Sequence, residues 1–152
     1  MPYLLLKFLH ILAAIAAVGT NLTYGAWIVR GKREPQALAF ALRGIRFLDN
    51  RVANPAYVAL LITGLGLAHV GKLPLTTPWL LAALVLYAGV ALVGMLGYTP
   101  TLRRQVEALE RSGFASAEFA ALARRGHRLG AAIGVLVLAI LFLMVCKPSF
   151  GA

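Results

Sequence analysis

Residues 129–146 read LGAAIGVLVLAILFLMVC, eighteen positions without a charged side chain. A helix needs about 20 predominantly apolar residues to cross a hydrocarbon core about 30 Å thick. Three further apolar stretches have comparable length, at residues 2–29, 54–70 and 77–98. The second is short, which local thinning of the bilayer can absorb. The sequence therefore predicts an all-α polytopic membrane protein, with four transmembrane helices in an antiparallel bundle.

The composition of the whole chain supports this class. Hydrophobic residues make up 61% and charged residues only 13%, against about 25% charged in a typical soluble domain. The single cysteine, Cys146, excludes a disulfide framework and a CxxC metal or redox site. Phosphate-binding, dinucleotide-binding and HExxH motifs are absent from the sequence. With no internal repeat or linker, we expect one transmembrane domain over residues 1–152.

The basic residues are distributed unevenly between the two sides of the predicted bundle. Of the 15 lysines and arginines, twelve lie in residues 30–51 and 98–128. Short loops rich in Lys and Arg stay in the cytoplasm. We therefore expect both termini outside, cytoplasmic connections, and a place in the bacterial cytoplasmic (inner) membrane. The net charge of +10 then indicates topology, and we expect no nucleic-acid partner.

Both connections carry helix signals. Thr99 can cap a helix that begins at Pro100 and ends at Gly113. Ser116 can start another. Residues 35–48 combine apolar positions with arginines, a pattern typical of a helix lying at the headgroup interface. We expect helical cytoplasmic connections.

A polar stripe marks one face of the first span. Helical spacing aligns His10 with Ala14 and Ala17 on one side, and with Lys7, Asn21 and Tyr24 along the same face. Because polar side chains inside a membrane are costly, this face should point into the bundle. His10 then either makes an interhelical hydrogen bond only, or binds a ligand or cofactor.

A second histidine reaches a similar predicted depth. His10 lies 20 residues from Arg30, about 30 Å of helix, and His69 lies 18 residues from Arg51, about 27 Å. Two imidazoles at one depth suit a haem with two axial histidines, although His69 can also be an interfacial side chain. We expect haem b in the outer half, between the first two spans. The expected iron ligands are His10 and His69, and the other expected cofactor-binding residues are Lys7, Asn21, Tyr24 and Lys72.

Several segments resemble a known family. They are YLLLKFLHI at residues 3–11, RVANPA at 51–56, GLG at 64–66 and VCKP at 145–148. They resemble the HemJ-type short membrane protoporphyrinogen oxidases, and His10 matches the first-span histidine of that family. The resemblance implies a four-helix membrane protein of haem synthesis that holds haem b. The chain is also similar to a related family of four-helix bacterial integral membrane proteins that shares this histidine-bearing span.

One position departs from the oxidase pattern. That family carries a lysine in its third span shortly after a Trp-Leu pair, whereas Trp79-Leu80 is followed here by Leu81, Ala82 and Ala83. Ala83 lies 20 residues from Arg103, and therefore at the predicted depth of His10. The resemblance therefore implies the haem site without this lysine.

Three functions follow from these features. The first is a haem b-binding protein for electron transfer or haem handling. The second is a protoporphyrinogen oxidase-like enzyme, and the third is a non-catalytic membrane scaffold or accessory subunit. The corresponding partners are the lipid bilayer, a redox partner or quinone, and a second copy in a homodimer.

Overall fold

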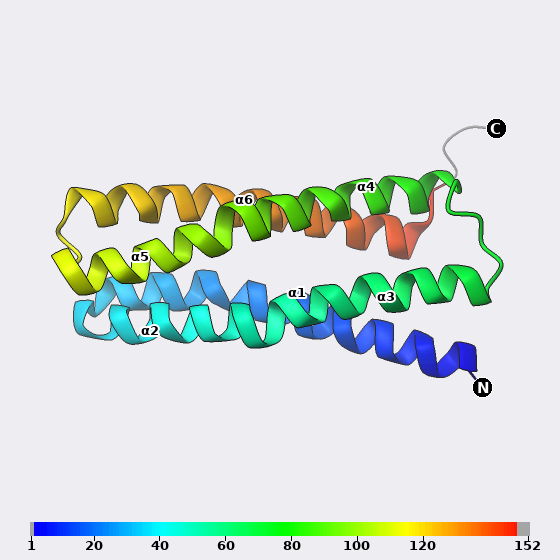
Figure 1. The fold of residues 1–152 in the computed structure, drawn as a ribbon, viewed down its shortest axis with the longest axis horizontal. Helices are drawn as coiled ribbons and strands as arrows, with labels where there is room; N and C mark the ends of the chain where they lie inside the picture. Colours follow the sequence, from blue (N-terminus) through cyan, green and yellow to red (C-terminus); the bar gives the residue numbers. More distant parts are fainter. Residues whose placement is uncertain (1, 149–152) are drawn as a thin grey trace.

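The computed structural model describes residues 2–148 and contains four long helical rods that run antiparallel (Figure 1). The first rod is α1 and the last is α6, and each of the two middle rods is built from three helical segments. The bounds are α1 Pro2–Arg33, α2 Pro35–Leu48, η1 Asp49–Ala53, α3 Asn54–Val70, α4 Pro78–Leu92, η2 Val93–Tyr98, α5 Thr99–Ser112 and α6 Ala117–Cys146. The four rods are long and apolar enough to cross a membrane, which confirms the predicted fold class.

The two middle rods remain helical through their internal prolines. Each proline follows a π-helical segment, since η1 precedes Pro55 and η2 precedes Pro100. A proline inside a helix removes one N–H and its ring crowds the carbonyl four residues earlier. A π-turn is one way to accommodate that defect without ending the helix. The junction residues Asp49 and Thr99 accordingly keep right-handed helical φ and ψ angles.

This continuity corrects two predictions about the connections. Thr99 is not an N-cap, because the helix runs through it from η2 into α5. Residues 35–48 do not form a separate helix lying along the membrane surface, because α2 continues into α3 and buries Leu42 and Ile45 within the bundle. The expectation that the connections are helical is confirmed. Ser116 does cap α6, where its hydroxyl accepts a hydrogen bond from the Phe119 N–H.

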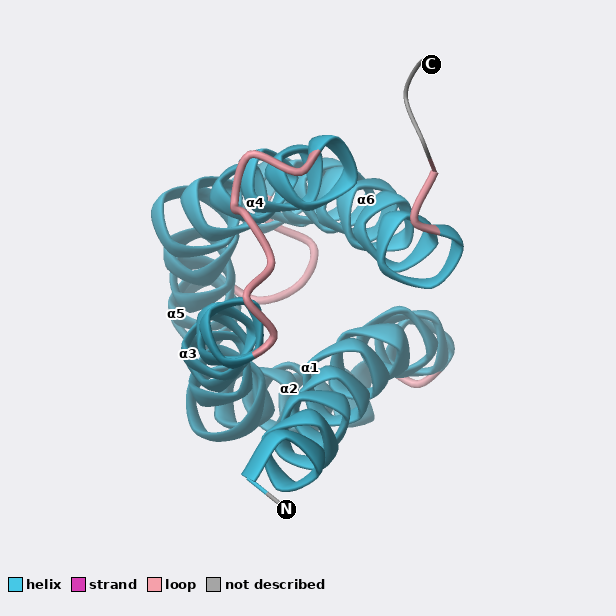
Figure 2. Ribbon diagram, turned by 90° about the vertical axis from the view of Figure 1, so that its right-hand side faces the viewer, coloured by secondary structure: helices cyan, strands magenta, loops and turns pink. Residues whose placement is uncertain are grey.

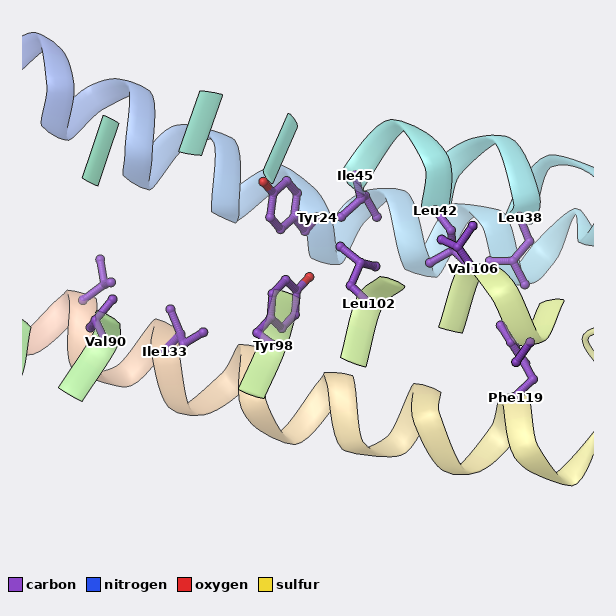
Figure 3. Close-up of a cluster of buried hydrophobic side chains, with 12 residues drawn as sticks. Tyr24, Leu38, Leu42, Ile45, Val90, Tyr98, Leu102, Val106, Phe119 and Ile133 are labelled. Carbon is purple, nitrogen blue, oxygen red and sulfur yellow. The ribbon is translucent and has the colours of Figure 1, made fainter. Parts of the chain in front are cut away.

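The buried core is concentrated in one half of the bundle, which we call the closed half. It consists of α2, α5 and the adjoining parts of α1 and α6, and it brings four helices around a shared interior (Figure 3). Gly31 lets α1 and α2 approach, since a Cβ atom there would lie 3.0 Å from Leu38 Cδ1. The buried side chains of this half include Leu38, Leu42, Ile45, Leu102, Val106 and Phe119.

The other half, which we call the paired half, is arranged as two helix pairs. There α1 packs on α3 and α4 packs on α6, and the end-on view in Figure 2 shows the two pairs as separate layers. Many large apolar side chains on these helices are exposed, among them Ile62 and Val135. From Tyr3 to Tyr24 the paired half measures about 32 Å at 1.5 Å per residue, close to the thickness of a hydrocarbon core. A hydrocarbon core that covers the paired half would leave the closed half outside it.

Candidate functional site

His10 sits in the contact between α1 and α3. Its Nδ1 lies 2.9 Å from the Thr63 hydroxyl, and a Cβ atom on Gly64 would lie 3.0 Å from His10 Cε1. Gly64 therefore lets the imidazole rest directly on the backbone of α3, since a Cβ atom there would displace the ring by a few tenths of an ångström. This glycine packs against the candidate ligand, a role that its place in the sequence did not distinguish from ordinary helix packing.

The Thr63 contact indicates which ring nitrogen of His10 carries the proton. The Thr63 hydroxyl donates to the Ala59 carbonyl oxygen at 2.6 Å, a local bond that helical threonines often make. A hydroxyl has only one proton, so its oxygen must accept from His10 and Nδ1 must carry the proton. We infer that the neutral imidazole presents a free lone pair at Nε2. A metal-binding histidine usually has its other ring nitrogen held in this way.

His69 does not lie at the depth of His10. Along the α1–α3 contact, His10 faces Gly64, Leu6 faces Gly66, and Tyr3 faces Gly71. His69 is therefore about 8 Å farther along α3 than the His10 level and about 140° around the helix from Gly64. Its side chain is exposed. The prediction of equal depth is wrong.

The error comes from the assumption that Arg30 and Arg51 lie at the same depth in the membrane. The observed contacts place Arg51 opposite a position near Tyr24, about 10 Å short of Arg30. Helix register is decided by which side chains fit against Gly64 and Gly66, whereas exposed arginines can occupy a range of depths by snorkelling.

The other predicted residues separate into two groups. The face of α1 that carries Ala17 and Tyr24 is buried, and Asn21 is half-buried, as expected. Lys7 and Lys72 are exposed, so the prediction that Lys7 faces the interior of the bundle is wrong. Lys7 lies one turn from His10 on α1, whereas Lys72 follows the end of α3 with a φ angle of +52°.

A polar cluster lies near the middle of the bundle, which we call the waist, where Asp49 of η1 contacts Thr99 at the start of α5. The buried carboxylate of Asp49, in η1, accepts a hydrogen bond of 2.8 Å from the Thr99 hydroxyl. Its second donor is the Asn54 amide at 3.5 Å. The Asp49–Thr99 bond joins the two middle rods directly beside the positions where prolines disturb their backbones.

Tyrosines surround this junction. Tyr24 and Tyr98 stack with parallel rings, their centroids 6.3 Å apart (Figure 3). The Asn21 amide donates to the Tyr57 hydroxyl at 2.8 Å, and the Tyr87 hydroxyl donates to the Tyr57 carbonyl oxygen at 2.7 Å. Within residues 2–148, the Tyr24 hydroxyl is the one buried side-chain oxygen that lacks a hydrogen-bond partner.

Sequence reasoning missed most of this cluster. It identified Asn21 and Tyr24 through the polar stripe but not Asp49, Tyr57 or Thr99. The available signal was the pair of X-Pro steps at Pro55 and Pro100, because a proline inside a long apolar helix predicts a local defect. That the two defects face each other depends on the packing of distant segments.

Ala83 occupies the third-span position discussed for the oxidase resemblance. It is 2% exposed and belongs to α4, which packs on α6. The stacked Tyr24 and Tyr98 place it level with His10, since both lie about 14 residues from that stack. No charged side chain therefore stands at this depth on α4.

The arrangement around His10 supplies one nitrogen ligand from this chain. Among the described residues, no group of three or more His, Cys, Asp or Glu side chains could hold a bare metal ion. A ligand of His10 would therefore have to bring most of its own coordinating atoms.

The comparisons with known proteins give the family. The family described as "Predicted integral membrane protein (DUF2269)" matches residues 4–148. Since this is nearly the whole chain, the protein belongs to that family and is an integral membrane protein with four candidate spans. Neither a curated protein nor a solved structure matches the chain.

Proposed function

We propose that this member of an integral membrane family binds haem b inside the bilayer, with His10 as an axial ligand. The observation that carries the proposal is the contact between His10 Nδ1 and the Thr63 hydroxyl, which itself bonds the Ala59 carbonyl oxygen. This pair of bonds favours a proton on Nδ1 and a free lone pair on Nε2. Haem fits this donor set better than a bare ion, because the porphyrin supplies four nitrogens and requires only axial ligands from the protein.

The geometry supports one axial ligand from this chain. His69 points away from His10 and lies farther along α3, so the two rings do not bracket one iron. Lys7, one turn from His10, suits a propionate carboxylate. Asn21 and Tyr24 belong to the waist cluster, about 16 and 21 Å along α1 from His10.

A bound haem supplies one-electron chemistry, and electron transfer or haem handling follows from it. The chain contributes orientation and environment. Thr63 holds the imidazole in one tautomer, and Gly64 lets the ring lie close to α3. The oxidase-like alternative gains no support from the third span, where Ala83 occupies the level of His10.

The test is the absorbance of protein purified in detergent from haem-supplemented cells. We expect a Soret band for the wild type, its loss in His10→Ala, and no loss in His69→Ala. Thr63→Val should weaken haem binding about 10- to 100-fold, as other changes to ligand-orienting groups do, whereas Thr63→Ser should retain it. A helical circular dichroism spectrum would show that each variant is folded.

A colourless wild-type protein would refute the haem proposal and favour the scaffold function. A Soret band that survives in His10→Ala would refute the assignment of the ligand. Growth rescue of a strain that lacks protoporphyrinogen oxidase would instead establish the enzymatic alternative.

The same proposal places the protein in the bacterial cytoplasmic membrane, with the closed half in the cytoplasm. The twelve basic residues in and beside that half motivate this orientation. Cysteine labelling of intact cells tests it, after the exposed Cys146 is replaced by serine. A cysteine at the exposed Leu75 should react from outside, and one at the exposed Ser112 should not. The reverse pattern would invert the topology.

A further inference from the structure

The closed half contains a small cavity that the haem site does not use. Its volume is about 50 Å³, and it lies between α1 and α6, with Tyr98 of η2 and Gln105 of α5 behind it. One side is apolar, formed in part by Leu38 and Phe119. At about 10–15 Å³ per water on this measure, it has room for about four waters, a number equal to the four oxygen atoms of a phosphate group.

The polar side chains around the cavity can all donate hydrogen bonds. Lys32 and His127 line it from α1 and α6, and the Tyr98 hydroxyl and the Gln105 amide are the other polar side chains. No carboxylate lines it. Among the described residues, Lys32 forms no ion pair. A cavity with an unpaired ammonium and neutral donors favours an anion.

Gln105 gives the clearest indication that this cavity is a binding site. The residue is only 6% exposed, yet within residues 2–148 its side chain makes no hydrogen bond to another protein group. The amide atoms are not sealed inside the protein, because Tyr24 Oη is the one buried side-chain polar atom without a partner in the described part of the chain, and water or a ligand in the cavity can therefore reach them. Gly126 leaves space opposite it, since a Cβ atom there would lie 3.5 Å from Gln105 Oε1. A ligand that accepts a hydrogen bond would satisfy this amide.

The cavity also lies at a specific depth. Tyr98 stacks on Tyr24 at the inner end of the paired half, where the hydrocarbon core ends. Gln105 is seven residues farther along, or about 10 Å. This interval matches the headgroup layer of the bilayer and the solution just beyond it. Phosphate groups are the abundant anions there, either in lipid headgroups or free in solution.

We propose that this cavity binds an oxyanion of the size of a phosphate group. Lys32 supplies the charge, His127 contributes a second donor at the mouth, and Gln105 and Tyr98 donate from the interior. The proposal does not depend on haem binding at His10, which lies about 33 Å from Lys32 along α1.

Two probes distinguish the source of the anion. Inorganic phosphate is titrated into the protein held in nanodiscs of phosphatidylcholine, and binding is followed by ³¹P line broadening. In parallel, protein from nanodiscs that also contain phosphatidylglycerol is released in a mass spectrometer to detect retained lipid. Binding of phosphate identifies a free anion, and retention of phosphatidylglycerol identifies a headgroup. Absence of both would overturn the proposal.

Variants separate the cavity from general surface charge. Lys32→Gln and the nearly isosteric Gln105→Met should each weaken binding about tenfold, because each removes one donor to an anion. Arg33→Gln and Arg125→Gln are the matched controls, because these exposed arginines do not line this cavity, and they should change binding less than twofold. Equal losses in Lys32→Gln and Arg33→Gln would overturn the proposal, as would unchanged binding in Gln105→Met in a folded protein.

Discussion

The closed half and the paired half are the two ends of the same four helical rods, yet they pack differently. In the closed half, Leu42 is fully buried and Ile45 is 1% exposed, whereas Ile62 and Val135 in the paired half are 66% and 68% exposed. Outside the bilayer, water drives apolar side chains together. Within it, lipid tails are as apolar as the side chains, so helices associate through close packing and hydrogen bonds.

The sequences of the two halves reflect this difference. The helices α2 and α5 are amphipathic, so each has one predominantly apolar face to bury. The helices α3 and α4 are apolar on all sides, and their contacts use small residues or single hydrogen bonds, as at Gly64 and Tyr57. The hydrogen bond between Thr99 and Asp49 lies where the closed half and the paired half join.

The largest expected difference in the free energy of unfolding is between a buried apolar residue of the closed half and an exposed one of the paired half. Leu42→Ala should lower the free energy of unfolding by about 2–5 kcal/mol, because it leaves a cavity in a water-exposed bundle. Val135→Ala should change it by less than about 1 kcal/mol, because lipid fills the space of an exposed side chain. Denaturant titration in a mild detergent measures both. Equal losses would show that the paired half is packed as tightly as the closed half.

Loss of the hydrogen bonds at the waist should have the next largest effect on the free energy of unfolding. Asp49→Ala removes the acceptor of the Thr99 hydroxyl and the partner of Asn54, and should lower the free energy of unfolding by about 1–3 kcal/mol. Replacing Thr99 in the Asp49→Ala background should then cost little more, since the two residues share one interaction. Additive losses in this double-mutant cycle would contradict a direct coupling of the two middle rods.

Two tyrosines in the same cluster should respond with different signs. Tyr57→Phe removes the acceptor of the Asn21 amide and should destabilise the protein by about 1 kcal/mol. Tyr24→Phe removes a buried hydroxyl without a partner and should leave stability unchanged or raise it by up to about 1 kcal/mol. Thermal unfolding of both variants gives the comparison. A loss in Tyr24→Phe as large as that in Tyr57→Phe would show that the Tyr24 hydroxyl has a partner in the bilayer.

Surface ion pairs of the closed half should matter least. Arg103 and Glu107 are 2.9 Å apart and both exposed, so Glu107→Gln should change the free energy of unfolding by no more than about 0.5 kcal/mol. The small effect should fade further in high salt. A larger effect, insensitive to salt, would indicate that the closed half is covered in the membrane rather than exposed to water.

Local patterns determined the class of the molecule and one part of its candidate site. Composition and run length are enough to predict four membrane helices, because any apolar stretch of about 20 residues meets the same bilayer thickness. The face of α1 that carries His10 and Tyr24 also followed from sequence, because residues three or four apart share one side of a helix. These inferences require no knowledge of neighbouring helices.

Tertiary structure alone decided how the helices match one another. Whether His10 meets Gly64 or His69 depends on sliding two helices past each other, and a shift of five residues moves a side chain about 8 Å and turns it to another face. The proline signals at Pro55 and Pro100 are read locally as helix starts, whereas π-turns let both rods continue. The meeting of Asp49 with Thr99 joins residues 50 positions apart. Such contacts arise from the fit of side chains on separate helices. The spacing of residues along either helix alone does not reveal them.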